Sequence, residues 1–159
     1  MITAKKIMSR DLITVPPDME ITGAAKILIE KGINGVPVVD RGKLVGILCQ
    51  SDLVTQQKKL PIPSFFSLLD GFIPLGSLKH FEKAVHRIAA TAVSDVMTPH
   101  PTTVSPETNI EEIASLMLEK NIHTIPVVDK GEIVGIIGKE DILKTLMPDM
   151  ETHNSLKTF

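Results

Sequence analysis

The chain has 159 residues, of which 17 are Lys or Arg and 19 are Asp or Glu, so its formal net charge is −2. This balance argues against a nucleic-acid binder that relies on positive charge, and 3% aromatic residues leave little material for base stacking. The sequence has no run of roughly 20 apolar residues that could span a bilayer, and its start lacks the apolar run of a signal peptide. With one cysteine, Cys49, it predicts a cytoplasmic protein without an internal disulfide.

An internal repeat with an offset of 89 residues organises the chain. Residues 4–56 align with residues 93–145 without a gap, and 18 of the 53 paired positions are identical. Two copies of this length predict two small half-domains that pack on each other about a pseudo-twofold axis. The predicted parts are a first repeat (1–56), a linker (57–92), a second repeat (93–147) and a C-terminal tail (148–159).

A short extended segment opens each repeat, at residues 12–15 and 101–104, and an amphipathic helix follows it. Apolar residues recur at helical spacing over 21–29 and again over 110–118. We therefore expect one face of each helix to be buried.

Signals for the ends of these helices are also present. Thr108, with Glu111 three residues later, has the pattern of a capping box and predicts the start of the second helix. Gly32 and Asn121 occupy the same repeat position, and these residue types best tolerate the left-handed conformation of a helix C-cap. We expect the helices to end there.

A β-hairpin follows each helix. Residues 34–48 and 123–137 each contain two β-branched runs, separated by Asp-Arg-Gly or Asp-Lys-Gly. Continuous apolar character predicts that both faces of each hairpin are covered, one by helices and the other by the second repeat. Pro37 and Pro126 remove a ladder donor from the first strand, so we expect that strand to be exposed along one edge, where a ligand's flat ring could bind. A further helix completes each repeat, which gives an α/β (α+β) fold class.

The linker at residues 57–92 has no counterpart in the repeat and holds four of the five phenylalanines. An amphipathic helix is predicted within it from the spacing of Leu78, Phe81, Val85, Ile88 and Ala92. This segment either covers the open edge of the two-repeat core or forms an oligomer or partner interface.

Three motifs together resemble the cystathionine-β-synthase (CBS) domain, which normally occurs in tandem pairs. They are VMTPHPTTVSPETNI at 96–110, the PVVD-x-G-x-x-VGI block in both repeats, and the acids Asp52 and Asp141. The resemblance implies a β-α-β-β-α fold in each repeat, with the two repeats packed through their sheets. It also implies a regulatory module, usually a homodimer, that binds AMP, ADP, ATP or S-adenosylmethionine in clefts between the repeats.

The resemblance implies one ligand site for each repeat. Asp52 and Asp141 would accept hydrogen bonds from ribose hydroxyls, as a carboxylate does in dinucleotide sites. Gly46 and Gly135 would allow the ligand to approach the backbone closely. The ligand-binding residues implied are Thr14, Gly35, Val36, Pro37, Ser51 and Asp52 in the first repeat, and Thr103, His123, Thr124, Ile125, Pro126, Lys139 and Asp141 in the second.

Two positions depart from the family pattern. Nucleotide-binding members usually carry Ser or Thr three residues before the acid, as a phosphate contact, whereas this chain has Cys49 and Gly138. Ser51 could partly substitute in the first repeat, and Lys139 supplies a cation in the second. A ligand with few phosphates therefore fits better than ATP.

Two functions from different classes are compatible with these residues. In the first, an adenosine ligand changes the packing of the repeats and signals in trans to an unknown partner protein. In the second, the clefts are unoccupied, Asp52 and Asp141 are only helix N-terminal residues, and residues 57–92 form the interaction surface. The sequence contains no recognisable nucleophile and base pair, phosphate loop or metal cluster, so neither an enzyme nor a required cofactor or metal is predicted.

Overall fold

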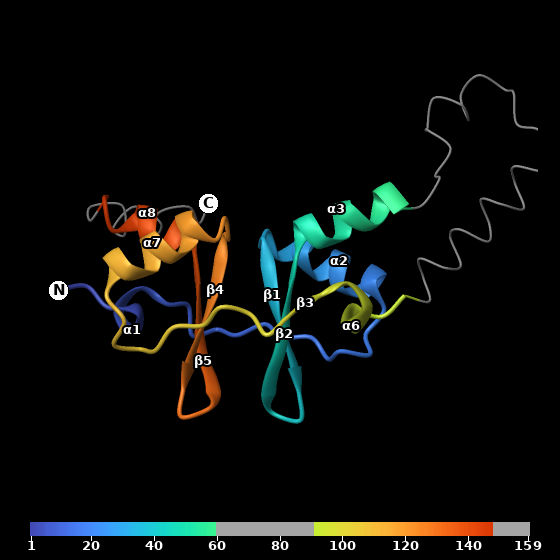
Figure 1. Cartoon of the computed structure of the whole chain (residues 1–159), viewed down its shortest axis with the longest axis horizontal. Coiled ribbons are helices and arrows are strands. Elements are labelled where there is room, and N and C mark those ends of the chain that lie inside the picture. The colour runs from blue at the N-terminus through green and yellow to red at the C-terminus, as the bar shows by residue number, and fades with distance from the viewer. Residues whose placement is uncertain (60–90, 148–159) are drawn as a thin grey trace, which may run out of the picture. The chain divides into compact units, whose positions relative to one another are not determined.

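The computed structural model describes residues 1–59 and 91–147 (Figure 1). These residues form two compact units. The first-repeat unit contains residues 14–41, 45–59 and 91–100, and the second-repeat unit contains residues 1–13, 42–44 and 101–147. Each unit combines helices and strands, as the α/β (α+β) class requires.

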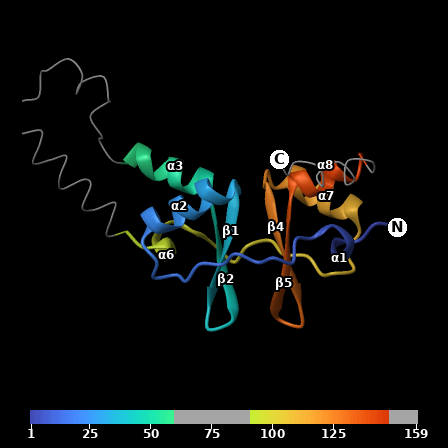
Figure 2. The ribbon, with the colours of Figure 1, turned by 180° about the vertical axis from the view of Figure 1, so that it is seen from behind.

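A three-stranded sheet forms the centre of the first-repeat unit. Its elements are α2 (Ile21–Lys31), β1 (Gly35–Asp40), β2 (Lys43–Cys49), α3 (Gln50–Lys59), α6 (Val93–Val96) and β3 (Thr98–Pro99). The strand order is β1, β2, β3, and β3 runs antiparallel to β2 with Thr98 opposite Ile47. Helices α2 and α3 contact each other and lie on the same side of the β1–β2 hairpin (Figures 1 and 2). The buried residues of the unit include Leu28, Val36, Val38, Leu48 and Val93.

The second-repeat unit has the corresponding elements. They are α1 (Ala4–Ile7), α7 (Ile110–Glu119), β4 (Thr124–Asp129), β5 (Glu132–Gly138) and α8 (Lys139–Lys144). β4 and β5 pair antiparallel, with an irregularity between Val127 and Val128. Helices α7 and α8 contact each other, and α1 and α8 both contact β5. The core consists of Ala4, Val104, Ile113, Met117, Ile125, Val127 and Ile137.

Each unit includes one segment that belongs in sequence to the other repeat. We call these two segments, residues 1–13 and 93–100, the exchanged segments. In the second-repeat unit, Ser9 exchanges two backbone hydrogen bonds with Ile136, of 2.9 and 3.0 Å, so the N-terminal segment pairs with β5. In the first-repeat unit, β3 pairs with β2, and the N–H of Val93 donates to the carbonyl of Met19 at 2.8 Å. The compact units therefore differ from the sequence repeats, because the first residues of each repeat pack on the other one.

Methionine side chains occupy the space beside two glycines, Gly46 on β2 and Gly135 on β5, where a Cβ atom would not fit. A Cβ added to Gly135 would lie 2.8 Å from Cγ of Met8 and closer still to its sulfur. A Cβ added to Gly46 would meet the Met97 sulfur and, at 3.0 Å, the carbonyl oxygen of Thr98. The close approach predicted at these glycines is thus made by the protein's own exchanged segments.

The hairpin turns confirm the prediction from Asp-Arg-Gly and Asp-Lys-Gly. Arg41 and Gly42 have φ values of 50° and 80°, and Lys130 and Gly131 have 50° and 83°. Positive φ at both central residues is the backbone of a type I′ turn, whose twist matches that of the flanking strands. The glycine in each turn adopts this conformation without steric cost.

The helix ends confirm one sequence signal and correct another. Gly32 and Asn121 both have positive φ, of 61° and 51°, as predicted for the ends of α2 and α7. The predicted capping box at Thr108 was wrong, because α7 begins one residue later. Asn109 is the N-cap, and its Oδ1 accepts the N–H of Glu112 at 2.8 Å. The Thr108 hydroxyl instead accepts the N–H of Ser105 within the preceding turn.

The extended segment before each amphipathic helix pairs parallel with the first hairpin strand at one residue. Val15 bridges Val38, and Val104 bridges Val127. The N–H of Val15 donates to the carbonyl of Pro37, at 3.0 Å. In a longer parallel ladder the N–H of residue 37 would bond the carbonyl two residues before Val15, and proline has no N–H. Pro37 therefore stops the pairing, and Pro126 occupies the equivalent position.

The C-terminal tail at 148–159 and residues 78–90 of the predicted linker helix lie outside the described residues. At Ala92 the helix prediction was wrong, because this residue is extended and bridges Glu20. Among the helices of residues 1–59 and 91–147, none has the length and hydropathy needed to cross a membrane. Within the same ranges, His, Cys, Asp and Glu form no group of three that could hold a metal ion.

Candidate functional site

The two candidate acids have the same local geometry. Asp52 is the third residue of α3, and its Oδ2 accepts the backbone N–H of Cys49 at 2.8 Å. Asp141 is the third residue of α8, and its Oδ2 accepts the N–H of Gly138 at 2.8 Å. Each carboxylate thus caps the start of its own helix, which is the simpler of the two roles considered from the sequence. In both, the second oxygen, Oδ1, is not used by the cap.

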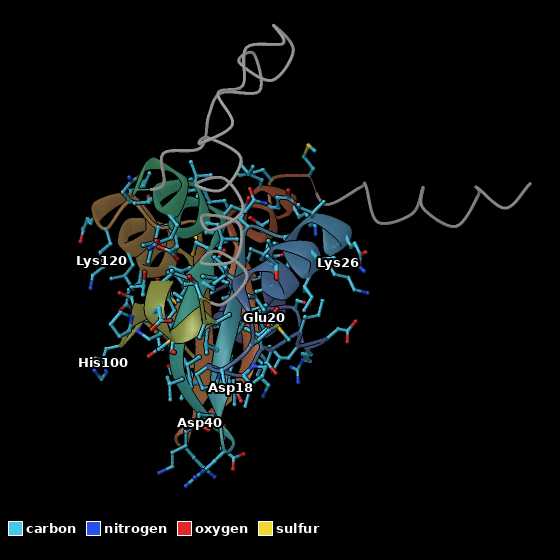
Figure 3. The ribbon with its side chains drawn as sticks, turned by 90° about the vertical axis from the view of Figure 1, so that its right-hand side faces the viewer. Asp18, Glu20, Lys26, Asp40, His100 and Lys120 are labelled. Atoms are coloured by element: carbon cyan, nitrogen blue, oxygen red, sulfur yellow. The ribbon has the colours of Figure 1, made fainter. Side chains whose placement is uncertain are left out.

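A backbone hydrogen bond joins the start of each of these helices to the start of the hairpin. The N–H of Gln50 donates to the carbonyl of Asn34 at 2.9 Å, and the N–H of Lys139 donates to the carbonyl of His123 at 3.1 Å. The acid therefore lies near the beginning of β1 or β4. Asp40, the last residue of β1, lies at the opposite end of the β1–β2 hairpin, away from α2 and its Lys26 (Figure 3).

The structure brings each implied set of residues into one unit. Thr14 directly precedes Val15, whose N–H binds the carbonyl of Pro37, and Thr103 precedes Val104, whose N–H binds the carbonyl of Pro126 at 3.1 Å. The first-repeat unit holds Thr14, Gly35, Val36, Pro37, Ser51 and Asp52, and the second-repeat unit holds Thr103, His123, Thr124, Ile125, Pro126, Lys139 and Asp141.

Burial divides each set in two. Val36, Pro37, Ile125 and Pro126 have less than 2% of their surface exposed, so the expectation of an exposed first strand was wrong for these side chains. They belong to the core because both faces of the strand are covered, so side chains that point to either face are buried. The exposed members are Thr14, Ser51, Thr103 and His123, and Asp52, Thr124, Lys139 and Asp141 are half-buried.

Asp52 lies in a less polar environment than an exposed carboxylate. Burial raises its pKa above the ordinary value of 3.8, and hydrogen bonds from the Cys49 N–H and the Thr98 side chain oppose that rise. Thr98 belongs to the exchanged strand β3, so this contact was missed from the sequence. The available signal was its repeat position, because Thr98 follows Met97 as Ser9 follows Met8.

The same environment governs Cys49. Burial, and in second place the nearby Asp52 carboxylate, raise the pKa of the thiol from 9.0 to about 11. The thiol therefore stays protonated at neutral pH and behaves as a small hydrophobic residue.

The second candidate site contains two lysines. Nζ of Lys144 lies 3.5 Å from Oδ1 of Asp141, a pair in which the lysine side chain is 74% exposed. Lys139 begins α8 beside the carbonyl of His123. The equivalent positions in the first repeat hold the neutral residues Thr55, Gln50 and Asn34.

Comparison with known families assigns both repeats. The CBS domain family matches residues 4–59 and 93–148, which are most of the chain. The chain belongs to the CBS domain family. The resemblance inferred from the motifs is thereby confirmed, and the chain contains a tandem CBS pair.

Relatives of this CBS pair occur in distant organisms. Protein MJ1426 of Methanocaldococcus jannaschii is 30% identical over 154 residues, which cover 90% of both chains. The chloroplastic CBS domain-containing protein CBSX2 of Arabidopsis thaliana is 31% identical over 157 residues. That match covers 92% of this chain and 63% of CBSX2, so the CBS pair spans less than two thirds of that relative.

Solved structures share the fold of the CBS pair. The crystal structure of CBSX2 in complex with AMP has a TM-score of 0.70 and 27% identity, over 93% of this chain and 98% of that one. The CBS domain pair of protein MJ0100, in complex with 5′-methylthioadenosine and S-adenosyl-L-methionine, has a TM-score of 0.66 and 29% identity. The match to MJ0100 covers 92% of this chain and 96% of that one. These similarities agree with two repeats of strands and helices.

Proposed function

We propose that this CBS pair is a regulatory module that binds an adenosine-containing ligand through Asp52 and Asp141. The observation that carries the proposal is the repeated arrangement of these acids, each held by a cap at the start of its helix, near the beginning of the first hairpin strand. The AMP complex of CBSX2 and the 5′-methylthioadenosine and S-adenosyl-L-methionine complex of MJ0100 support the choice of ligand class. The proposal assigns no catalytic step to the pair.

The geometry of the cap suits a ribose contact. Because Oδ2 accepts the N–H of Cys49 or Gly138, the side chain is held in one orientation. The remaining oxygen can accept a hydrogen bond from a ribose hydroxyl, and a charged acceptor makes such a bond stronger than a neutral one. Thr14 and Thr103, exposed beside the same strand edges, supply additional hydroxyl groups.

Isothermal titration of the full chain with AMP, ADP, ATP, S-adenosylmethionine and 5′-methylthioadenosine tests the proposal, with GMP as the control for the base. The informative variants are Asp52→Asn and Asp141→Asn. Asparagine keeps an oxygen for the cap but turns an NH₂ group toward the ligand, so the variant folds and loses one ribose acceptor. We expect each substitution to weaken binding at its own site, and the double variant to abolish it.

A chain that binds none of the adenosine compounds would contradict the proposal and leave the interaction module with unoccupied clefts. A thermal-shift screen distinguishes the two rapidly, because a ligand at 100 times its dissociation constant stabilises the folded state by about 2.7 kcal/mol. Signalling in trans predicts in addition that the ligand changes the affinity of the CBS pair for a partner protein. The size of this change is limited by the difference between the ligand's affinities for the two packing arrangements of the repeats.

We also propose that the pair is a homodimer that associates through its helices. Ile29 on α2 and Leu118 on α7 are 78% and 77% exposed, and they occupy equivalent repeat positions. Val54 and Leu143, on α3 and α8, are likewise exposed and equivalent. A second copy presents the same two apolar faces, as a twofold interface requires. Sedimentation of the Ile29→Glu, Leu118→Glu variant should give a monomer, and an unchanged dimer would reject this interface.

A further inference from the structure

We propose that the two sites of this chain divide adenosine ligands by the charge at the 5′ position. The second-repeat site takes an adenosine 5′-phosphate, and the first-repeat site takes an adenosine whose 5′ substituent carries no net negative charge. This inference rests on the proposed adenosine function and adds the specificity of each site. It comes from three equivalent positions at which only the second repeat has a cationic or protonatable side chain.

The first of these positions begins the helix that carries the acid. Gln50 and Lys139 both donate their backbone N–H to the residue before the hairpin strand, so their side chains start from equivalent places. The Gln50 amide nitrogen donates to the carbonyl of Ile33 at 3.0 Å, which keeps that side chain at the end of α2. Lys139 places an ammonium group on a half-buried residue at the same position.

The other two positions flank the acid. Asn34 is replaced by His123, an exposed side chain directly before β4. Thr55 is replaced by Lys144, whose Nζ lies 3.5 Å from Oδ1 of Asp141. In the first repeat, the Thr55 hydroxyl donates to the carbonyl of Ser51 at 2.8 Å and adds no charge.

The local charge differs as a result. Over the six residues of α8, the positive charges of its two lysines balance the negative charges of Asp141 and the exposed Glu140. Over the equivalent residues 50–55, Asp52 is the only charged side chain, and it is half-buried. A phosphate beside Asp52 meets an unscreened like charge, whereas a neutral thioether does not and a sulfonium cation is attracted. Beside Asp141 the two lysines offset that repulsion, and with the ring N–H of His123 they supply donors to a phosphate.

Reciprocal exchange of the differing residues tests the inference by titration with AMP and with 5′-methylthioadenosine. The His123→Asn, Lys139→Gln variant installs the first-repeat residues in the second repeat. We expect it to lose about tenfold in AMP affinity, the effect of one charge a few ångströms away, with 5′-methylthioadenosine binding unchanged. The Asn34→His, Gln50→Lys variant should gain AMP affinity by a similar factor. Binding at the unaltered site is the folding control: 5′-methylthioadenosine for the His123→Asn, Lys139→Gln variant, and AMP at the second-repeat site for the Asn34→His, Gln50→Lys variant, whose added AMP binding belongs to the first-repeat site.

Single substitutions of the acids assign the ligands to their sites. Asp141→Asn should weaken AMP binding and preserve 5′-methylthioadenosine binding, and Asp52→Asn should do the reverse. Raising the salt concentration should weaken AMP binding more than 5′-methylthioadenosine binding, because the first depends on charge. If both compounds bind but the exchanged variants leave their affinity ratio unchanged, this inference is overturned and the proposed function stands. If neither compound nor S-adenosylmethionine binds the unaltered chain, the proposed function itself fails.

Discussion

The side chain of Met8 fills the space beside Gly135 on β5, and these two residues come from opposite repeats. Met97 lies beside Gly46 in the same way. Each contact holds an exchanged segment against the second strand of a hairpin, next to the backbone bonds that Ser9 makes with Ile136. The exchange also places Thr98 on the carboxylate of Asp52, so the same arrangement that joins the repeats shapes one of the candidate sites.

Replacing Gly135 with alanine should destabilise the chain. The new Cβ would lie 2.8 Å from Cγ and 3.0 Å from Cβ of Met8, so the exchanged segment must shift. Overpacking of this kind costs about 1–3 kcal/mol, measured as a lower free energy of unfolding in denaturant.

The matched control for this prediction is Gly23→Ala. Gly23 lies inside α2, and an added Cβ would meet Cγ of Met19 at an ordinary contact distance of 3.6 Å. Because alanine loses less conformational freedom than glycine in a helix, this change should stabilise the chain by about 0.5–1 kcal/mol. The double variant Met8→Ala, Gly135→Ala should lose less than the sum of the two single changes. Full additivity, or a Gly135→Ala chain as stable as the original, would show that the contact is not tight.

Replacing Asn109 with alanine should cost about 1 kcal/mol of unfolding free energy, because the Glu112 N–H then loses its capping partner. Asn109→Asp should retain most of the stability, since aspartate caps equally well. Thr108→Ala removes only an exposed bond within the preceding turn and should cost less. Thermal unfolding of the three variants ranks them, and a larger loss for Thr108→Ala would restore the cap expected from the sequence alone.

Stability should depend on pH through Asp52. Its folded pKa is raised above 3.8, chiefly by burial, so the folded chain binds the proton more tightly than the unfolded chain. The contribution of this group is fully present below the ordinary pKa and is lost as pH rises through the folded pKa. The Asp52→Asn variant keeps the cap but cannot ionise. Its melting temperature should therefore gain on that of the original chain as pH rises above the ordinary pKa of 3.8, and a constant difference would show no raised pKa.

Cys49 should react slowly with iodoacetamide at neutral pH. The pKa of about 11 leaves very little thiolate, and the residue is half-buried. The denatured chain should react much faster at the same pH. Asp52→Asn removes the second cause of the raised pKa, so the alkylation rate should rise at a lower pH than in the original chain. Rapid labelling of the folded chain at pH 7 would contradict the buried, protonated thiol.

The sequence by itself determined the features that depend on neighbouring residues. The repeat, the two hairpins with their Arg-Gly and Lys-Gly turns, and the left-handed helix ends at Gly32 and Asn121 were predicted correctly. The CBS resemblance was also readable, because its motifs are local. Such signals are legible because a turn or a helix end is decided by the φ preferences of one or two residues.

Only the tertiary structure decided which segments pair at a distance. The docking of the N-terminal segment on β5 and the contact of Thr98 with Asp52 both join residues far apart in the chain. No local preference encodes such contacts, because several apolar segments could satisfy the same strand edge. Packing selected among them through shape, as when Met8 fills the space that Gly135 leaves.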